Sequence, residues 1–258
     1  MRAETVFYKE PIHGAMVRPV LLKLGGSVIT DKATPGKFRR PATKRLLGEL
    51  ARANVPAVLF HGSGSFGHPP AKKHGAGKRT LKPEGVSEIL AAANRLHAEV
   101  VQVASDAGLR PLSFPLHQTV TSEQGQLEDY PVQRLVRAIE EGYTPVLSGT
   151  LVRDDELGWR VASADELMGD LAGEVDPRLA LFCTDVDGVL GPDGVLPTAS
   201  PATLDDLFDA GGNGDDVTGR MAGKLERAFQ VATMCPTWIR NGDVRGRLQA
   251  VLKGEDVP

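Results

Sequence analysis

Short apolar runs alternate with longer segments of helical periodicity along this chain. The runs 20–24, 55–60 and 180–184 are compact and apolar, as is typical of buried parallel strands. Between such runs, apolar residues recur every three or four positions, most clearly from Pro83 to Ala107, and Gly108 follows as a C-cap residue. This alternation predicts an α/β fold, a three-layer αβα sandwich with a mostly parallel central sheet. The predicted strands are 20–24, 55–60, 111–114, 144–147, 180–184 and 238–240, with a hairpin over 151–161. The predicted helices are 41–53, 83–107, 132–141, 163 or 164 to about 173, 201–210, 218–234 and 243–252.

The first 16 residues do not follow this pattern. Residues 1–16 contain Pro11 and Gly14 and show no clear period, so they are predicted to be an N-terminal extension. Residues 17–258 are predicted to form one domain, in which the glycine-rich run 211–216 is a flexible linker.

Charge and composition exclude several classes of function. Thirty basic and 33 acidic residues give a net charge of -3, which is too balanced for a protein whose main partner is nucleic acid or an anionic membrane. No apolar run approaches the roughly 18–20 residues of a membrane span, and the N-terminus lacks the apolar core of a signal peptide. A cytoplasmic location is therefore expected, in which Cys183 and Cys235 are buried free thiols.

Three predicted strands end in glycine-rich turns, after Leu24, Phe60 and Thr184. Ligands in open α/β sheets bind at such strand ends. The richest turn is His61-Gly-Ser-Gly-Ser-Phe-Gly-His68, a loop whose bare amides can bind phosphate oxygens. It also spells G-x-G-x-x-G, but it follows the second strand, and Pro69-Pro70 is expected to interrupt any helix after it. Phosphate binding is favoured over dinucleotide binding and over a turn without a ligand.

Isolated charged residues near these turns leave alternatives open. Lys23 lies near the carboxyl end of an apolar strand, where an unpaired buried ammonium is costly, so it needs an anionic ligand or a carboxylate. The alternative is an edge-strand lysine that faces water. Taken alone, Lys224 could be an ordinary solvated lysine and Asp165 a helix-start residue. Asp185 and Asp187 could form a turn or hold a metal.

Other common site signatures are absent from the sequence. There is no Walker A motif, no HExxH spacing and no G-x-S-x-G nucleophile elbow around Ser63 and Ser65. The histidines do not form a convincing metal site, and no metal-ligating residue is assigned. Four of them are taken as surface or packing residues: His13, His74, His97 and His117.

Five segments, taken together, carry a family resemblance. They are Lys23-Leu-Gly-Gly-Ser-Val-Ile-Thr-Asp-Lys32, His61-Gly-Ser-Gly-Ser-Phe-Gly-His68, Ser163-Ala-Asp165, Thr184-Asp-Val-Asp-Gly188 and Asp216-Val-Thr-Gly-Arg-Met-Ala-Gly-Lys224. Together they resemble the amino acid kinase superfamily, and within it the isopentenyl phosphate kinases, and the resemblance covers Val20 to about Asp243.

The resemblance implies an acceptor-binding lobe over about 17–175 and a nucleotide-binding lobe over about 176–258. It implies transfer of the γ-phosphoryl group of ATP, with Mg²⁺, to isopentenyl phosphate, giving isopentenyl diphosphate for isoprenoid biosynthesis. Transfer between two anions needs cations and amides that align them, which fits the residues present. The implied partner is a small-molecule phosphate, with no nucleic acid or membrane, and the implied assembly is a homodimer.

The resemblance also implies roles for single residues. Lys23 and Lys224 would stabilise the migrating phosphoryl group, Asp165 would orient them, and His68 would hydrogen-bond the acceptor phosphate. The implied nucleotide-binding residues are Lys23, Gly25, Gly26, Ser27, Lys32, Thr184, Asp185, Asp187, Gly188, Gly219 and Lys224. The implied acceptor-binding residues are Gly62, Ser63, Gly64, Gly67, His68 and Gly149.

The chain departs from the family pattern at three positions. Ser63 and Ala164 stand where the family usually has glycine, and Thr150 stands where it usually has aspartate. Ser63 keeps its amide, but Thr150 removes a carboxylate, which puts the identity of the acceptor in doubt. The competing interpretations are a fosfomycin-type or other small phosphonate or phosphate kinase, and a nucleotide-binding member without catalysis.

Overall fold

The computed structural model describes residues 17–78, 80–191, 194–196, 198–200 and 222–255. The N-terminal extension, the predicted helix 201–210, the predicted linker 211–216 and the predicted cap Thr218 lie outside the described residues.

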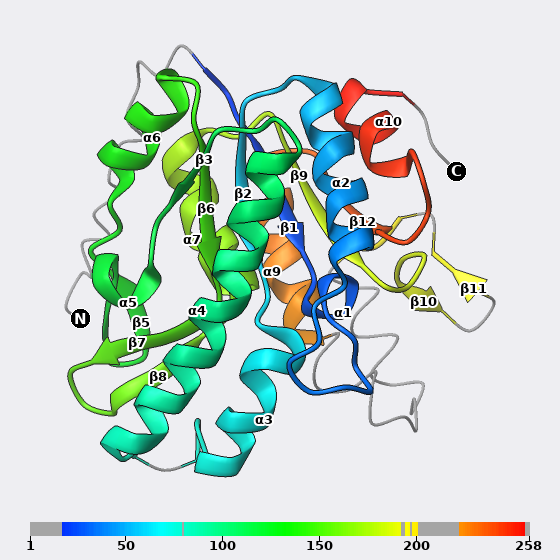
Figure 1. The fold of residues 1–258 in the computed structure, drawn as a ribbon. Helices are drawn as coiled ribbons and strands as arrows, with labels where there is room; N and C mark the ends of the chain where they lie inside the picture. The colour runs from blue at the N-terminus through cyan, green and yellow to red at the C-terminus, as the bar shows by residue number, and fades with distance from the viewer. Residues whose placement is uncertain (1–16, 79, 192–193, 197, 201–221, 256–258) are drawn as a thin grey trace.

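A parallel sheet forms the centre of the molecule (Figure 1). Its strand order is β12-β9-β1-β2-β6-β3, and every neighbouring pair is parallel. The first strand is therefore central, and Lys23 is not an edge-strand residue. The strands are β1 Val20–Leu24, β2 Ala57–His61, β3 Pro111–Ser113, β6 Thr144–Ser148, β9 Leu179–Thr184 and β12 Thr237–Asn241.

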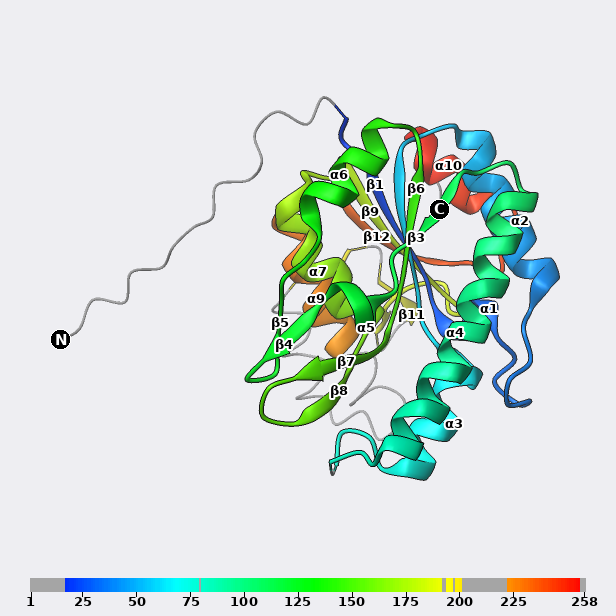
Figure 2. The same ribbon diagram turned by 60° about the vertical axis from the view of Figure 1, so that its left-hand side comes forward.

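Helices cover both faces of this sheet, so the predicted αβα sandwich is confirmed (Figure 2). Successive side chains of a strand point to opposite faces. Accordingly, Leu21 packs in the apolar cluster on one face, while Leu22 and Leu24 pack in the cluster on the other. The first face is covered by α6 Val132–Glu140, α7 Ala164–Val175 and α9 Ala222–Ala232. The second is covered by α2 Arg40–Ala53, α4 Pro83–Asp106 and α10 Arg247–Lys253.

A smaller sheet, of order β5-β4-β7-β8, is connected to the central sheet through β7, which begins directly after β6. It contains the predicted hairpin, and its acidic turn is organised by Asp154, which is fully buried. The Asp154 carboxylate accepts hydrogen bonds from the Leu157 amide at 2.7 Å and the Ser122 hydroxyl at 2.7 Å, and these lower its pKa. The strands are β7 Thr150–Asp154, β8 Gly158–Ala162 and the two that were not predicted, β4 Thr121–Glu123 and β5 Gln126–Glu128. The remaining short elements are α1 Gly26–Ile29, α5 Leu116–Thr119, β10 Leu190–Gly191 and β11 Gly194–Val195.

The glycine-rich stretch, predicted to be a loop, is largely helical. Helix α3 spans Gly64–His74 and runs through Pro69 and Pro70, which were expected to interrupt it. Because Pro69 has no N–H, the carbonyl of Ser65 lacks its intrahelical donor. The Gly36 amide takes that place, donating to the Ser65 carbonyl at 2.9 Å.

The last helix begins later than predicted, at Arg247 instead of Asp243. Gly246 precedes it with a φ of 80°, a left-handed conformation that glycine adopts without strain.

Two expectations from composition can be compared with the structure. Cys183 and Cys235 are buried free thiols, as predicted, and burial raises the pKa of Cys183 to about 12. Within the described ranges, no helix combines the length and the apolar character that crossing a membrane would require.

Candidate active site

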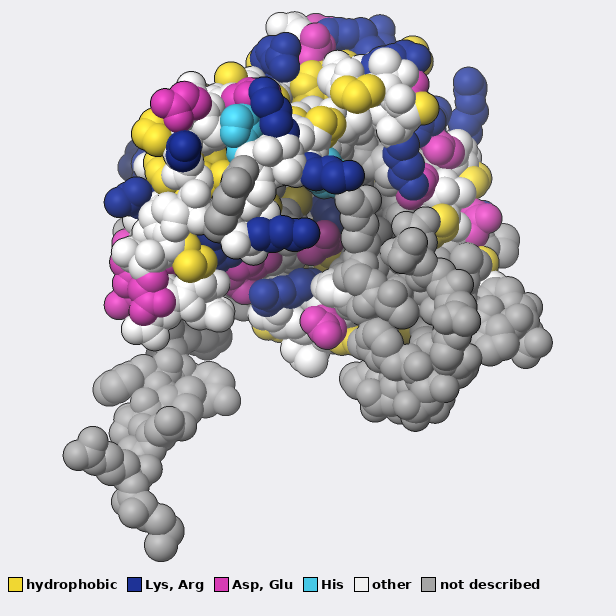
Figure 3. Space-filling view, turned by 90° about the horizontal axis from the view of Figure 1, so that it is seen from below, with side chains coloured by type: hydrophobic (Ala, Val, Ile, Leu, Met, Phe, Trp, Pro, Cys, Tyr) yellow, Lys and Arg dark blue, Asp and Glu magenta, His cyan; other side chains and the backbone are white. Residues whose placement is uncertain are grey.

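The three glycine-rich turns meet at the carboxyl edge of the sheet. Strand β1 lies between β9 and β2, and Leu24 pairs with both Cys183 and His61. The segments after these strands therefore begin side by side. Figure 3 looks onto this end of the molecule, where Lys, Arg and carboxylate side chains surround a hollow in the surface.

The turns after β1 and β2 pack backbone against backbone. A Cβ on Gly26 would lie 2.6 Å from the Gly64 backbone, and one on Gly62 would lie 2.9 Å from the Gly26 nitrogen. Gly64 also has a φ of 44°. Glycine is thus required at this contact for space as well as for conformation. The two predicted phosphate-binding turns are in direct contact.

Lys23 and Asp165 form an ion pair beneath this contact. Lys23 shares a sheet face with Leu21, since the two are separated by one residue, and that face is covered by α7. Asp165 lies in the first turn of α7, which is fixed by a capping box between Ser163 and Glu166. The side chains of Lys23 and Asp165 are 7% and 20% exposed, so the pair is screened from most water.

A second polar cluster lies at the end of β9. Asp185 accepts from the Ser27 hydroxyl at 2.8 Å and pairs with the Lys32 ammonium at 2.6 Å. Burial raises the pKa of Asp185, but the bonds from Lys32 and Ser27 outweigh it, and the net pKa is lowered. This cluster joins the turn after β1 to the turn after β9.

The rest of the turn after β9 is anchored to the C-terminal region. Asp187 accepts from Asn241 at 3.2 Å and from Arg247 at 3.0 Å. Gly188 is buried against Val195. Thr184 is the last residue of β9 and is 2% exposed.

The predicted acceptor turn, which follows β2, begins beside Gly149 and ends at His68. His68 lies in the second turn of α3 and is exposed, so the histidine predicted to end a loop is instead carried by a helix. Gly67 packs against Ser63, where a Cβ would lie 2.6 Å from the Ser63 side chain. The Gly149 amide donates to the His61 carbonyl at 3.0 Å, and a Cβ there would lie 2.7 Å from the Ala164 nitrogen.

A buried histidine pair supports the acceptor turn from behind. His61 Nε2 lies 2.9 Å from His97 Nδ1, and His97 Nε2 lies 2.7 Å from the Ser113 hydroxyl. Burial lowers the pKa of His61 to about 3 and that of His97 to about 4, so both rings are neutral near pH 7. His97 was taken as a surface or packing residue; it is buried and hydrogen-bonded.

The Gly62 carbonyl next to His61 determines the tautomers of both histidines. The Gly62 carbonyl, 3.2 Å from His61 Nδ1, can only accept, so Nδ1 carries the proton and Nε2 accepts from His97. His97 Nε2 must then accept from the Ser113 hydroxyl. The chain of donors runs from β3 through α4 to the first glycine of the acceptor turn.

Two predicted site residues cannot be compared with the structure. Gly219 lies outside the described residues. Lys224 lies in α9, but its side chain is not among the described groups. Helix α9 packs along α7, the helix that carries Asp165.

Thr30 is the site residue for which sequence reasoning gave no role. It belongs to the first quoted motif, and its side chain contacts both phosphate-binding turns. Its position between two glycine-rich segments is not visible from local spacing, since Thr30 and Ser65 are 35 residues apart.

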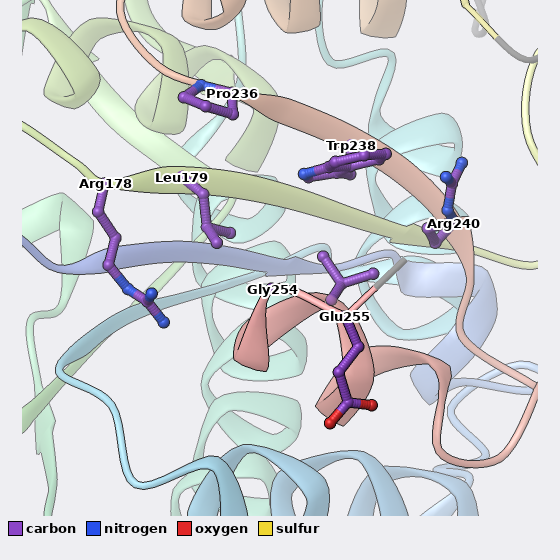
Figure 4. A pocket seen from close by; sticks show the side chains of 8 residues that line it. Arg178, Leu179, Pro236, Trp238, Arg240, Gly254 and Glu255 are labelled. Carbon is purple, nitrogen blue, oxygen red and sulfur yellow. The ribbon is translucent and has the colours of Figure 1, made fainter. Parts of the chain in front are cut away.

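A separate pocket lies between β9, β12 and α10 (Figure 4). It has a volume of about 400 Å³ and includes Leu179 and Pro236, which lie at the opposite end of the strands from the turns. It therefore does not belong to the candidate site.

The arrangement at the carboxyl edge can hold two phosphate-bearing ligands close together. Amides at the starts of α1 and α3 and the cations Lys23 and Lys32 are groups of the kinds that phosphoryl transfer uses. Among the described residues, no group of three or more His, Cys, Asp or Glu could hold a metal ion.

Comparison with known proteins gives a consistent result. The sequence profile described as Amino acid kinase family matches residues 18–241. The isopentenyl phosphate kinase of Thermoplasma acidophilum is 30% identical over 226 residues, covering 86% of this chain and 89% of the relative. That of Haloferax volcanii is 34% identical over 217 residues, covering 81% and 86%. An X-ray structure of an isopentenyl phosphate kinase superposes with a TM-score of 0.79 at 26% identity, covering 93% of this chain and 98% of the other.

Proposed function

This chain belongs to the amino acid kinase family, and we propose that it transfers the γ-phosphoryl group of ATP to isopentenyl phosphate. The product is isopentenyl diphosphate, a precursor for isoprenoid biosynthesis. The relatives with isopentenyl phosphate kinase activity in their names match nearly the full chain, which does not favour a fosfomycin-type kinase.

One observation supports this proposal most directly: two glycine turns in contact, with a buried lysine below them. Donor and acceptor are both anions, so their phosphates must be held together against repulsion. Amides of the turns can bind one phosphate each, and Lys23 can neutralise charge between them.

The proposed nucleotide side uses the turns after β1 and β9. Gly26 and Ser27 offer amides to the ATP phosphates, Gly25 fixes their turn by donating its own amide to the Cys183 carbonyl at 2.8 Å, and Lys32 contributes a cation. Lys224 joins Lys23 on the migrating group, and Asp165 orients these lysines. Mg²⁺ would be held largely by the phosphate oxygens of ATP and would neutralise the charge that develops in transfer. The remaining residues proposed to border the nucleotide are Thr184, Asp185, Asp187, Gly188 and Gly219.

The proposed acceptor side uses the turn after β2 and the start of α3. The amides of Ser63 and Gly64 bind the acceptor phosphate, while Gly62, whose amide donates to the Leu24 carbonyl at 3.1 Å, sets the turn together with Gly67 and Gly149. His68 donates a hydrogen bond to that phosphate, which selects a phosphorylated acceptor. The acceptor lobe is about 17–175, the nucleotide lobe is about 176–258, and the proposed assembly is a cytoplasmic homodimer.

An ADP-release assay across a panel of acceptors tests the function. The panel contains isopentenyl phosphate, dimethylallyl phosphate, fosfomycin, N-acetylglutamate and a blank. We expect turnover with the isoprenoid phosphates and little above the blank with the others. Turnover of fosfomycin alone would identify a phosphonate kinase, and ATP binding without turnover on any acceptor would identify a non-catalytic member.

Variants of His68 test the acceptor side. His68→Ala should lower kcat/KM by roughly 10²-fold, since loss of one positioned donor to a charged group costs about that much. His68→Asn should be milder because the amide can still donate. His74→Asn, on the same helix but bonded to Glu88, is the matched control and should keep wild-type activity. An unchanged rate in His68→Ala would remove His68 from the mechanism.

A further inference from the structure

Thr30 links the two phosphate-binding turns through one hydroxyl. Its Oγ1 donates to the Gly26 carbonyl at 2.6 Å and accepts from the Ser65 amide at 3.0 Å. A threonine hydroxyl has one proton and two lone pairs, so both bonds can form together. Thr30 is 1% exposed, so water does not compete for these bonds.

The bond to Ser65 also caps a helix that lacks its own cap. Ser63 occupies the N-cap position of α3 and makes no side-chain capping bond. The Ser65 amide is one of the donors that the first helical turn leaves without an intrahelical acceptor. Thr30, from the segment after β1, supplies that acceptor. The start of α3 is therefore positioned by the nucleotide side of the site.

The segment after β1 also binds the backbone carbonyl of Ser65. The Ser65 carbonyl, left without a helical donor by Pro69, accepts from the Gly36 amide at 2.9 Å. Lys32 lies between Thr30 and Gly36 in sequence and pairs with Asp185. Residues 30–36 thus bind both backbone groups of Ser65 while carrying a cation of the proposed nucleotide site.

The Thr30 side chain is packed tightly against Gly64 of the predicted acceptor turn. A Cβ on Gly64 would lie 2.2 Å from Thr30 Oγ1, so the hydroxyl sits directly against the acceptor turn. A side chain that is larger, or a turn that moves by an ångström, could not keep this packing.

From these contacts we propose that Thr30 is a positioning residue, which sets the separation of the nucleotide and acceptor turns and thereby the approach of the two phosphates. Thr30 touches neither reacting group in this account. It acts through Gly26 and Ser65, and its role rests on the phosphotransfer function proposed above. In-line transfer depends on alignment, and a displacement of about 1 Å can cost roughly 10²-fold in rate.

A pair of matched variants tests the role of the hydroxyl. Thr30→Val keeps the β-branch and replaces the hydroxyl with a methyl that can neither donate nor accept a hydrogen bond, whereas Thr30→Ser keeps the hydroxyl. In steady-state assays with ATP and isopentenyl phosphate, Thr30→Val should lower kcat by about 10–100-fold, with each KM changed less than about threefold. Thr30→Ser should recover kcat to within about threefold of wild type.

A second variant tests the same role without changing Thr30, in case Thr30→Val does not fold. Pro69→Ala gives the Ser65 carbonyl an intrahelical donor, which competes with Gly36 without disturbing the core, since Pro69 is exposed. It should lower kcat in the same direction, by about three- to tenfold, with a wild-type circular dichroism spectrum.

The outcomes separate this inference from the proposed function. If wild type uses a different acceptor, the variants are compared on that acceptor, and the inference is tested independently. A Thr30→Val protein that melts earlier yet keeps the wild-type kcat well below its melting temperature would overturn it, as would Thr30→Ser being as impaired as Thr30→Val.

Discussion

A buried lysine in the middle of a parallel sheet needs a compensating negative charge, and Asp165 supplies it for Lys23. Side chains alternate between the two faces of a strand, so the Lys23 side chain points to the face that α7 covers. The capping box fixes the first turn of α7, which carries Asp165. The resulting pair is largely desolvated, since the Lys23 side chain is only 7% exposed. Removing one partner would leave a buried charge without compensation.

The first prediction concerns this pair. Asp165→Asn keeps the size of the side chain and removes its charge, and should lower the free energy of unfolding by about 2–3 kcal/mol, below the range for a fully buried pair because Asp165 is partly exposed. A non-hydrolysable ATP analogue should stabilise this variant more than wild type, because its phosphates give Lys23 a new partner. Urea denaturation with and without the analogue measures both effects.

An exposed ion pair provides the control for that prediction. Asp176 pairs with Arg18 at 2.9 Å, with side chains 64% and 55% exposed. Asp176→Asn should cost less than about 1 kcal/mol and leave the response to the analogue unchanged. Equal stabilisation of Asp165→Asn and wild type by the analogue would argue against contact between Lys23 and the phosphates.

Single residues differ in how far the sequence could predict them. Lys23 could be identified as a site residue because a charge in an apolar strand violates a strong pattern. The bridging role of Thr30 and the hydrogen bonds of His97 could not, since their partners Ser65 and His61 are 35 and 36 residues away. Only the packing of α3 and α4 brings these groups together.

At the scale of elements, strands and long helices were predicted more accurately than helix ends. The apolar runs place β1 and β9 within one residue, because a buried strand is marked along its whole length. Helix α3 was interpreted as a loop because glycine and proline have low helix propensity. Bonds from Thr30 and Gly36, which are distant in sequence, override that propensity.

Helix α10 shows the same dependence on a distant cap. Glu49 of α2 is 1% exposed and accepts from the amides of Gly246 at 3.0 Å and Gln249 at 3.3 Å, and from Arg45 at 2.8 Å. A carboxylate at a helix N-terminus satisfies its open donors and its dipole. The start of α10 is thus set by a residue 197 positions earlier, which local pattern cannot show.

The second prediction removes this cap. Glu49→Gln places an amide donor among three donors, and should lower the free energy of unfolding by about 2–3 kcal/mol, the range for a buried hydrogen bond to a charged group. Hydrogen exchange should show the loss of protection concentrated in α10. Glu99→Gln, at an exposed pair with Arg40, should cost less than about 1 kcal/mol. Uniform loss of protection across the sheet would contradict a local capping role.

At the scale of the whole molecule, the order of elements largely determines the fold. Alternation of strands and helices predicts a parallel sheet with both faces covered, and the structure has this form. The order of strands within the sheet was not predicted. That order places β1 between β2 and β9, and so it decides that the turns which follow them share one site.

The last prediction concerns the pH dependence of the whole fold. As pH falls through 6.5, the unfolded chain takes up protons on His61 and His97, whereas the folded rings stay neutral until about pH 4 and below. The folded state therefore loses stability as pH falls, by about 1.4 kcal/mol per pH unit for each ring. Between pH 6 and 4.5 this loss should dominate, because the carboxyls of Asp154 and Asp185 are then largely ionised in the unfolded chain as well as in the folded one, where their pKa values are lowered. Urea denaturation at several pH values in this range measures how steeply the free energy of unfolding changes with pH. In His97→Gln one ring no longer titrates, so about half of the slope that the two rings supply should remain.

Ser113→Ala is the control. It keeps both rings and should keep the slope, even where its overall stability falls. An equal slope in His97→Gln and wild type would mean that the buried pair does not govern the acid response.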